Sequence, residues 1–500
     1  MQTEMAKEVY ALCEKISTEP DYTQNDVAII LAAGHGKRIK SQKSKMLHNI
    51  WGVSSVERVY NACSAGIPGI NSVVVVGIKA PDVIRVIGNR ERTQFAYQEI
   101  QKGTGHAVQV GLERIDETKF NGTVFVLPGD MGLLDKRTMT EFRDKFRESK
   151  SDMMVLTGIY EGPVEANYYG RIVRVKNKDA EGKKSTDAGN VIEIIEHKDI
   201  LALHDDKPYI TSYKGRHYSF TKDELLKINE YNSGVYAFDY KKLTELIHSI
   251  KSENSQNEIY ITDLIALFNK QGYNVSSSSP KEQYVLMGFN DKAVLKEMEK
   301  VYRQNVYNKI KNIIEIEDPD DFFIHDEVVE TILNQDTKGE PLDIHLGKGV
   351  YIGKGVDLNY NLTLKRNVVV QGNVIFGKNV TVWENVLLST FPTQKFKIGN
   401  NVEILWGDII KGNIEIGENT KIESSVNMTG SDEYPLRIGK NVLVKGTSYI
   451  FGSIIEDDIH IEHSVLINKR VEKLIKKNGQ IQKVQFYLPM PSGIDTISDL

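Results

Sequence analysis

Cysteine is scarce in this sequence, whose 500 residues include only Cys13 and Cys63. Two cysteines cannot form the disulfide framework of a small secreted domain, so the composition favours a reducing, cytoplasmic setting. A net charge of −5 is small for this length and argues against a nucleic-acid partner. No apolar run approaches the roughly 20 residues that a bilayer span requires, so we expect no membrane partner.

Two common phosphate-binding patterns are also missing. The P-loop pattern G-x-x-x-x-G-K-[ST] does not occur, and the glycine-rich stretch 27–48 lacks the third glycine of the dinucleotide fingerprint. That stretch reads VAIILAAGHGKRIKSQKSKMLH: a buried strand, then small residues that let backbone amides approach a ligand. An ordinary strand-to-helix turn followed by a solvated basic segment would read the same way. Five nearby cations favour a nucleoside triphosphate instead: Lys37, Arg38, Lys40, Lys43 and Lys45.

Strand and helix patterns alternate through the first half of the chain. Apolar runs at 27–31, 72–77, 95–98 and 123–127 are separated by helical patterns. This alternation predicts an α/β, doubly wound, Rossmann-like parallel sheet, which binds ligands at the carboxyl ends of its strands. Gly34 and Asp130 both follow strands, so we expect them in one crevice. The N-terminal segment reads as an amphipathic helix, and we expect these residues to pack on the protein: Met5, Val9, Leu12 and Ile16.

Two oxygen-bearing side chains are candidate Mg²⁺ ligands. Asp130 follows a buried strand in LPGDMGLL, although an aspartate in an ordinary turn would look the same. Asn290, in LMGFND, is the second candidate, and its alternative role is to cap the helix that begins near Asp291.

Other residues are candidates for binding a base or a sugar. Gln98 carries an amide that can read a pyrimidine edge, and Gly103 and Thr104 offer open backbone to a flat base, or simply cap a helix. Three residues could bind a sugar through hydrogen bonds, although each could equally be an ordinary loop residue: Gly170, Glu196 and Asn232. Two polar segments, 177–190 and 204–229, have the composition of surface loops or lids.

The second half repeats every six residues. Eight aliphatic residues stand in unbroken register, and the corners carry Gly or Asn: Ile344, Val350, Val356, Leu362, Val368, Val374, Val380 and Val386. A period of six with turn residues predicts a parallel β-helix. We therefore divide the chain into an N-terminal helical extension (1–25), an α/β domain that carries the glycine-rich loop (26–290), a helical linker (291–340), a β-helix (341–468) and a tail (469–500).

Taken together, these motifs resemble one family, the bifunctional N-acetylglucosamine-1-phosphate uridylyltransferase/glucosamine-1-phosphate acetyltransferases. The family loop is close to LAAGxGTRMxSxxPKxLH, against LAAGHGKRIKSQKSKMLH here. The family's later motifs follow in the same order: Q-x-x-x-x-GTGHAV, GD, YGRI(V/T)R, EHKD, N-(T/S)-G and G-x-N. The resemblance covers roughly residues 26–318, and its fold implies that the solenoid is a left-handed β-helix.

The resemblance implies a role for each matched residue. Arg38 would stabilise the triphosphate in the transition state, and Lys45 would hold the sugar phosphate and the α-phosphate. Asp130 and Asn290 would hold Mg²⁺. The uridine contacts would be Ala33, Gly34, Gln98, Gly103 and Thr104, and the N-acetylglucosamine contacts would be Gly170, Glu196 and Asn232. The expected substrates are UTP and a sugar 1-phosphate, and the expected assembly is a homotrimer through the β-helix.

The sequence also departs from the family. Lys37 and Ser44 replace the usual Thr and Pro of the loop, Gly132 replaces a Pro, and the segment between Asp199 and Asn229 is longer. The acetyltransferase stretches HLSYLGD and GAGTxxxNYDG are absent, so we expect no acetyl transfer. Two alternatives to UDP-N-acetylglucosamine formation stay open at this point: the same chemistry on another hexose 1-phosphate, and a non-catalytic regulatory subunit with the same pair of domains.

Overall fold

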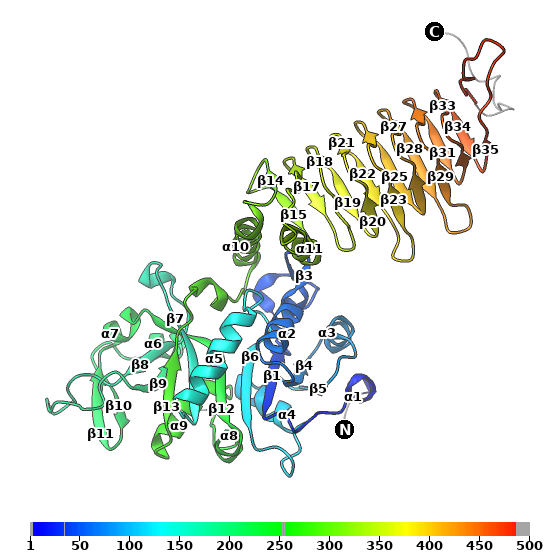
Figure 1. Ribbon diagram of the computed structural model, residues 1–500. Coiled ribbons are helices and arrows are strands. Elements are labelled where there is room, and N and C mark those ends of the chain that lie inside the picture. The colour runs from blue at the N-terminus through cyan, green and yellow to red at the C-terminus, as the bar shows by residue number, and fades with distance from the viewer. Residues whose placement is uncertain (1–3, 35, 253, 255, 487–500) are drawn as a thin grey trace, which may run out of the picture. The chain divides into compact units, whose positions relative to one another are not determined.

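The computed structural model describes residues 4–34, 36–252, 254 and 256–486. The chain forms two compact units, Met1–Glu299 and Lys300–Leu500 (Figure 1), and each is described by itself. Within the described residues, no helix is both long and apolar enough to cross a bilayer.

A nine-stranded, mostly parallel sheet forms the centre of the first unit. β1 (Asp26–Ala32) lies between β4 (Asn71–Val76) and β6 (Thr123–Pro128) and runs parallel to both. The sheet continues with β5 (Thr93–Tyr97) on one side and with β12 (Glu230–Asp239), β7 (Met153–Ile159) and β13 (Val275–Ser278) on the other. β8 (Arg171–Arg174) and β9 (Val191–Ile195) extend it from β12.

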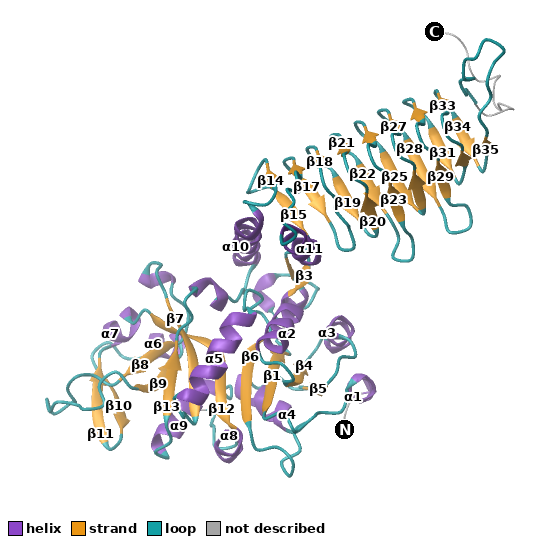
Figure 2. Cartoon of the chain, viewed as in Figure 1, coloured by secondary structure: helices purple, strands orange, loops and turns teal. Residues whose placement is uncertain are grey.

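Helices cover both faces of this sheet, as Figure 2 shows. Alternate residues of β1 enter different cores: Ala28 and Ile30 pack with α2 (Ser55–Gly66) and α5 (Lys136–Glu148), whereas Val27 and Ile29 pack with residues of the helices on the other face. Those helices are α4 (Thr104–Leu112), α8 (Tyr240–Ile247) and α9 (Leu264–Lys270). The predicted doubly wound Rossmann-like sheet is therefore confirmed.

The N-terminal helix α1 (Glu4–Ile16) lies against β5 and α3 (Ala80–Ile87). Its buried residues are Ala6, Val9 and Cys13, and the side chains of Leu12 and Ile16 are partly buried beside them. Met5 is 71% exposed, so the expectation that it packs on the protein was wrong. The buried stripe therefore centres on Ala6, Val9 and Cys13 and not on Met5.

The segment 204–229 is ordered structure rather than a surface loop. It forms the hairpin β10 (Tyr209–Tyr213) and β11 (Arg216–Phe220), followed by helix α7 (Lys222–Lys227). Their apolar side chains join residues of β8, β9 and α6 (His197–Ala202) in a separate small core: Val173, Val175, Ile192, Ile195, Ile200, Tyr213, Tyr218, Phe220 and Leu225.

The second unit is a left-handed parallel β-helix, as predicted. Its short strands stack into three sheets, which begin with β14 (Glu315–Ile316), β15 (Phe322–Ile324) and β20 (Val374–Phe376). The inward positions hold the hexapeptide aliphatics, and Val350, Leu362, Val368 and Val380 are at most 1% exposed. Burial of each coil's aliphatic face on the next drives this stacking.

The asparagines at one corner of the β-helix form a ladder. Each has a positive φ, which asparagine tolerates better than most residues: Asn361, Asn379, Asn401, Asn419 and Asn441. Each side-chain amide donates to the residue above it, over 2.8–3.2 Å, and the last, Asn441, donates to the Asp458 carboxylate. The corner residues seen in the repeat therefore turn the chain and also link successive coils.

The interval 291–340, which we expected to be helical, contains α10 (Lys292–Ile310) and α11 (Asp326–Asp336). It also contains β14 and β15, which pair with β16 (His345–Leu346) and β17 (Val350–Ile352). After the last coils, the described part of the tail adds β35 (Arg470–Val471), and residues 487–500 lie outside the described residues.

Candidate functional site

Lys45, Asp130 and Asn290 meet at one point, although they are far apart in the chain. The Lys45 ammonium donates to Asp130 Oδ2, and also to Asn290 Oδ1 over 2.8 Å. The Lys45 side chain is 9% exposed and that of Asp130 is 17% exposed, so the ion pair is largely shielded from water. The two predicted metal ligands therefore aim their oxygens at the same position, and a cationic group occupies it.

The loops after β1 and β6 bring these groups together. Lys45 begins the short helix η2 (Lys45–Leu47), and Asp130 lies two residues beyond the end of β6. Gly36 has φ +62°, and a Cβ there would stand 2.6 Å from Lys45 Cβ, so only glycine lets the loop lie against Lys45. Gly288 lies beside the Asp130 carboxylate, since a Cβ there would meet it at an ordinary contact distance of 3.4 Å.

Asn290 does not cap the following helix. Asp291 does so, because its Oδ1 accepts a hydrogen bond from the Val294 amide over 3.0 Å at the start of α10. This leaves the Asn290 side chain to face Lys45. The alternative role considered for Asn290 is thus filled by its neighbour.

The phosphate-loop candidates Ala33 and Gly34 follow β1 directly. Gly34 is exposed, and a Cβ there would contact only Met46 Cε, at 3.5 Å, so the backbone stands open to a ligand. Ala33 is buried, and its carbonyl accepts a hydrogen bond from Gln101 Nε2. Arg38, on η1 (Lys37–Ile39), is exposed, and the structure does not bring it into the Lys45 cluster. His35 lies outside the described residues.

The base candidates form a braced segment next to this loop. Gln98 is 3% exposed, and its Nε2 lies 3.3 Å from the Gly103 carbonyl and 3.0 Å from His106 Nδ1. Gly103 has φ +109°, and a Cβ there would stand 2.6 Å from the Ile259 carbonyl. Thr104 Oγ1 accepts a hydrogen bond from the Ile261 amide over 3.3 Å. Sequence reasoning gave no role to His106, which orients the Gln98 amide, and no local signal marked that contact.

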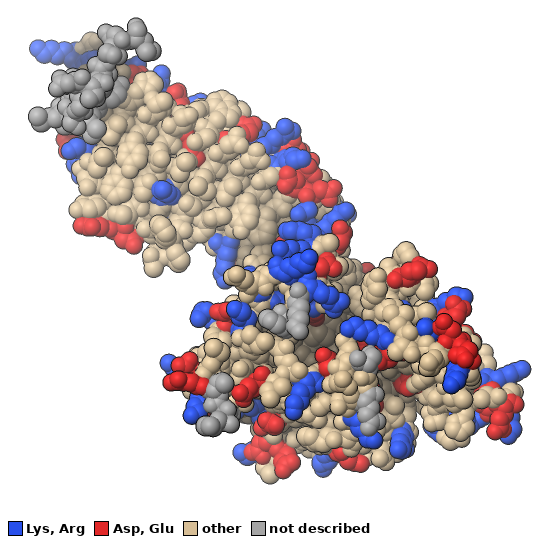
Figure 3. Space-filling view, turned by 180° about the vertical axis from the view of Figure 1, so that it is seen from behind, with Lys and Arg blue, Asp and Glu red and all other residues tan. Residues whose placement is uncertain are grey.

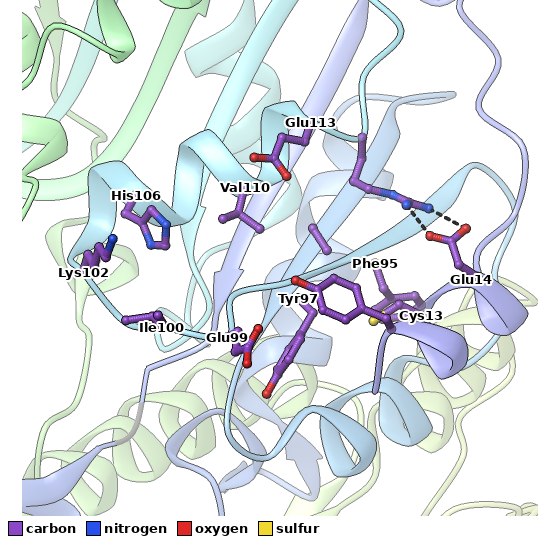
Figure 4. Close-up of a pocket in the computed structure, with 13 residues that line it drawn as sticks. Cys13, Glu14, Phe95, Tyr97, Glu99, Ile100, Lys102, His106, Val110 and Glu113 are labelled. Atoms are coloured by element: carbon purple, nitrogen blue, oxygen red, sulfur yellow. Dashed lines mark hydrogen bonds and ion pairs between the residues drawn. The ribbon is translucent and has the colours of Figure 1, made fainter. Parts of the chain in front are cut away.

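A hollow of about 380 Å³ lies behind this segment, between α1, β5 and α4 (Figure 4). Tyr10 and Tyr97 meet edge to face across it at a centroid distance of 5.3 Å, and Glu14 pairs with Arg114 at its rim. His106 also lines this hollow. Lys45, Asp130 and Asn290 do not, so it is separate from their cluster.

The sugar candidates Gly170, Glu196 and Asn232 lie together. The Asn232 backbone N–H donates to the Gly170 carbonyl over 3.0 Å, and a Cβ on Gly170 would stand 3.2 Å from Glu196 Oε1. Asn232 lies at a bulge of β12, where its Oδ1 accepts from the Gly234 amide over 2.9 Å. Burial, with the nearby Asp199 and Asp263 carboxylates, raises the pKa of Glu196 to about 7.

Two residues that the sequence did not single out support the sugar candidates. Arg171 is fully buried and donates to Asn167 Oδ1 over 3.0 Å and to the Tyr169 carbonyl, which fixes the loop before Gly170. The Tyr169 ring stacks on Tyr231 at 4.5 Å. Burial and the Asp130 carboxylate raise the pKa of Tyr169.

Comparisons with known proteins agree with this arrangement. Residues 28–185 match the family model described as the MobA-like NTP transferase domain. The chain is 33% identical over 316 residues to the "Bifunctional protein GlmU" of Acetivibrio thermocellus, covering 62% of this chain and 60% of that protein. It is also 33% identical over 304 residues to the GlmU of Thermoanaerobacter pseudethanolicus, covering 60% and 57% respectively.

Among solved structures, a UDP-glucose pyrophosphorylase complexed with UDP-glucose aligns with a TM-score of 0.40 and 16% identity, over 56% of this chain and 99% of that one. The chain spans about 60% of the length of the two GlmU proteins it matches. The resemblance seen in the motifs is thereby confirmed: over about 60% of its length the chain is similar in sequence to the bifunctional GlmU proteins.

Proposed function

We propose that this protein is a sugar-1-phosphate nucleotidylyltransferase that joins UTP and N-acetylglucosamine 1-phosphate to give UDP-N-acetylglucosamine and pyrophosphate. The observation that carries the proposal is the convergence of Lys45, Asp130 and Asn290 beyond the carboxyl ends of β1 and β6. In open α/β sheets, ligands bind at this edge. The similarity to GlmU proteins over about 60% of the chain supports the same assignment.

The residues present fit a magnesium ion. Mg²⁺ prefers oxygen ligands, and it is usually held by one or two protein groups together with substrate phosphates and water. The Asp130 carboxylate and the Asn290 amide oxygen already point at a single cationic position, here taken by Lys45. When bound, the metal would neutralise charge on the phosphates and on the departing pyrophosphate.

The protein's own residues would position the reactants and neutralise charge. A phosphate oxygen of the sugar 1-phosphate attacks the α-phosphorus of UTP, and the bond to the β-phosphate oxygen breaks. Because the nucleophile is already an anion at neutral pH, no general base is required. Arg38 and Lys45 would hold the phosphates in line, and catalysis would come from orientation and electrostatic stabilisation.

The remaining candidates would select the substrates. The open backbone at Gly34 would leave room for the nucleotide, and Gly103 would hold the base segment in its turn against Ile259. The Gln98 amide, held by His106, would read the uracil edge. Glu196 would accept hydrogen bonds from sugar hydroxyls, and Asn232 would bind the acyl group. The nucleotide would thus be bound by five candidates and the sugar by three: Ala33, Gly34, Gln98, Gly103 and Thr104 for uridine, and Gly170, Glu196 and Asn232 for the sugar.

We further propose that the β-helix does not transfer acetyl groups. The family's acetyltransferase stretches are absent, and each of the three histidines of this region has a partner in the second unit. His345 pairs with Glu315 at 2.7 Å, His460 pairs with Glu462 at 3.2 Å, and His463 contacts Thr447 at 2.8 Å. Another protein would then supply the acetylated sugar phosphate.

We propose instead that the β-helix assembles the chain into a homotrimer. One of its sheets carries a continuous outward row without a charged residue: Phe323, Tyr351, Val369, Leu387, Ile409, Asn427, Tyr449 and Val465. The matching rows of the other two sheets contain several charged residues, such as Lys421 and Arg437. Figure 3 shows a broad face of the β-helix with few charges. Such a face is typical of an interface between copies of a chain.

The experiment that tests the function measures pyrophosphate release from UTP and Mg²⁺ with three sugars: N-acetylglucosamine, glucose and glucosamine 1-phosphates. Strong preference for the acetylated sugar is the expected result. Preference for another sugar would keep the reaction but overturn the roles of Glu196 and Asn232. No release with any sugar or nucleotide would favour the regulatory-subunit alternative.

A further inference from the structure

The position of the Lys45 ammonium raises a question about the order of binding. It donates to the two oxygens that we assign to the metal, from Asp130 and Asn290, and it lies 5.6 Å from the centre of the Phe289 ring. Lys45 is 7% exposed overall, so the ammonium is largely withdrawn from water. A divalent ion cannot take the same two oxygens while the ammonium stays between them.

We propose that Lys45 acts as an internal cation that closes the metal site in the free protein and exchanges places with the divalent metal when the nucleotide binds. The inference rests on the proposed function, because it uses Asp130 and Asn290 as metal ligands. It adds a positioning role for Lys45 before any chemistry occurs. The Asp130 carboxylate would then have a cationic partner both before and after binding.

The surroundings of Lys45 suit such an exchange. The Gly36 backbone lies directly against the Cβ of Lys45, because a Cβ built on Gly36 would stand only 2.6 Å from it. The base of the Lys45 side chain therefore has little room to shift. The long, flexible stem of lysine still lets its ammonium swing to a new anion. The triphosphate would supply that anion, because the cationic loop is next to the site. A buried carboxylate left unpaired is strongly unfavourable, so the ammonium and the metal should exchange in one step.

The proposal makes metal affinity depend on the nucleotide. Without nucleotide, a metal ion must displace the ammonium and leave it in a largely buried position with no anion. With nucleotide, the released ammonium gains a phosphate partner, and the metal gains phosphate oxygens. The free protein should therefore bind a bare divalent ion weakly, and removal of the Lys45 charge should strengthen that binding.

The test measures Mn²⁺ binding to the full-length chain without nucleotide, using the electron paramagnetic resonance signal of free Mn²⁺. Lys45→Met should bind Mn²⁺ about tenfold or more tightly than the wild type, because a like charge at contact distance disfavours a second cation. Lys45→Gln, which can still hydrogen-bond to Asp130 and Asn290, should do the same if the methionine variant folds poorly. The matched control is Lys292→Met, which removes an exposed charge two residues from Asn290 and should change the affinity by less than about twofold.

Asp130→Asn separates the two ways in which the idea can fail. If both Lys45 variants bind Mn²⁺ no better than the wild type while Asp130→Asn binds it more weakly, the exchange is refuted and the metal assignment stands. If adding Asp130→Asn to Lys45→Met leaves Mn²⁺ binding unchanged, the metal assignment is refuted and the exchange fails with it. Tighter binding by both Lys45 variants, lost again when Asp130→Asn is added, supports the exchange.

Discussion

Asp408 occupies a position in the β-helix where the repeat calls for an aliphatic residue. It lies beside Val386 in the neighbouring coil, because Leu387 pairs with Ile409, and it is 0% exposed. Its Oδ1 accepts a hydrogen bond from the Val426 amide over 2.8 Å, whereas its buried Oδ2 has no partner among the described residues. Burial raises the pKa of Asp408 to about 8, so the folded coil holds the protonated acid at neutral pH.

The sign of the pH dependence follows from this shift. The folded pKa lies above the unfolded value of about 3.9, so the unfolded chain loses its proton first as the pH rises. The contribution to stability is complete below about pH 4 and is lost progressively up to about pH 8, at about 1.4 kcal/mol per pH unit. Over the whole window the loss is at most about 6 kcal/mol.

Asp408→Asn imitates the protonated acid at every pH and keeps the acceptor for Val426. We expect the stability difference between this variant and the wild type to grow by about 2.7 kcal/mol between pH 5.5 and 7.5, and to level off above about pH 8. Urea unfolding followed by tryptophan fluorescence measures it, because Trp383 and Trp406 both lie in the β-helix, 5.1 Å apart. Asp432→Asn, which neutralises an exposed carboxylate of the same unit, is the control. Parallel stability curves for Asp408→Asn and wild type would refute the reasoning.

Three further predictions concern the candidate site. Arg38→Ala should fold normally, because the side chain is exposed, and should lose about 10²–10³-fold in kcat; wild-type turnover would remove Arg38 from the mechanism. Asn290→Ala should abolish metal-dependent turnover, whereas Asp291→Ala should cost about 1 kcal/mol of stability through loss of the helix cap and retain activity; equal effects on activity would return Asn290 to a structural role. The KM for the sugar phosphate should rise as the pH falls below about 7, because protonated Glu196 is a poorer acceptor, and Glu196→Gln should remove that part of the profile; a profile that the substitution leaves unchanged would contradict the assignment.

The regular parts of the fold could be predicted because their patterns are local. The apolar run 27–31 is continuous since β1 is buried on both faces, and each of its residues enters one of two cores. The six-residue register predicted the β-helix because every sixth aliphatic side chain points inward. The strands β14 and β15 were not predicted because they precede that register, and α11 separates both of them from it in the sequence.

The convergence of the candidate site could not be predicted in the same way. Lys45 is 85 positions from Asp130 and 245 from Asn290 along the chain. The sequence could place Asp130 at the end of a strand, but only the tertiary structure shows that the Asn290 amide faces the same ammonium. The contact between Gln98 and His106 is closer in sequence, yet it depends on the turn at Gly103, whose φ of +109° has no unique pattern.

The hairpin that was mistaken for a loop bears on the choice of sugar. Lys214 and Gly215 both have positive φ, so they form a tight two-residue turn between β10 and β11, and that dipeptide was the available signal. The hairpin's aromatic residues pack into the small core that includes Ile195 and Ile200, on either side of Glu196. A packed core fixes the direction of a side chain more firmly than a mobile loop can. The longer segment 199–229 would therefore influence the sugar through the position of Glu196 rather than by covering the site as a lid.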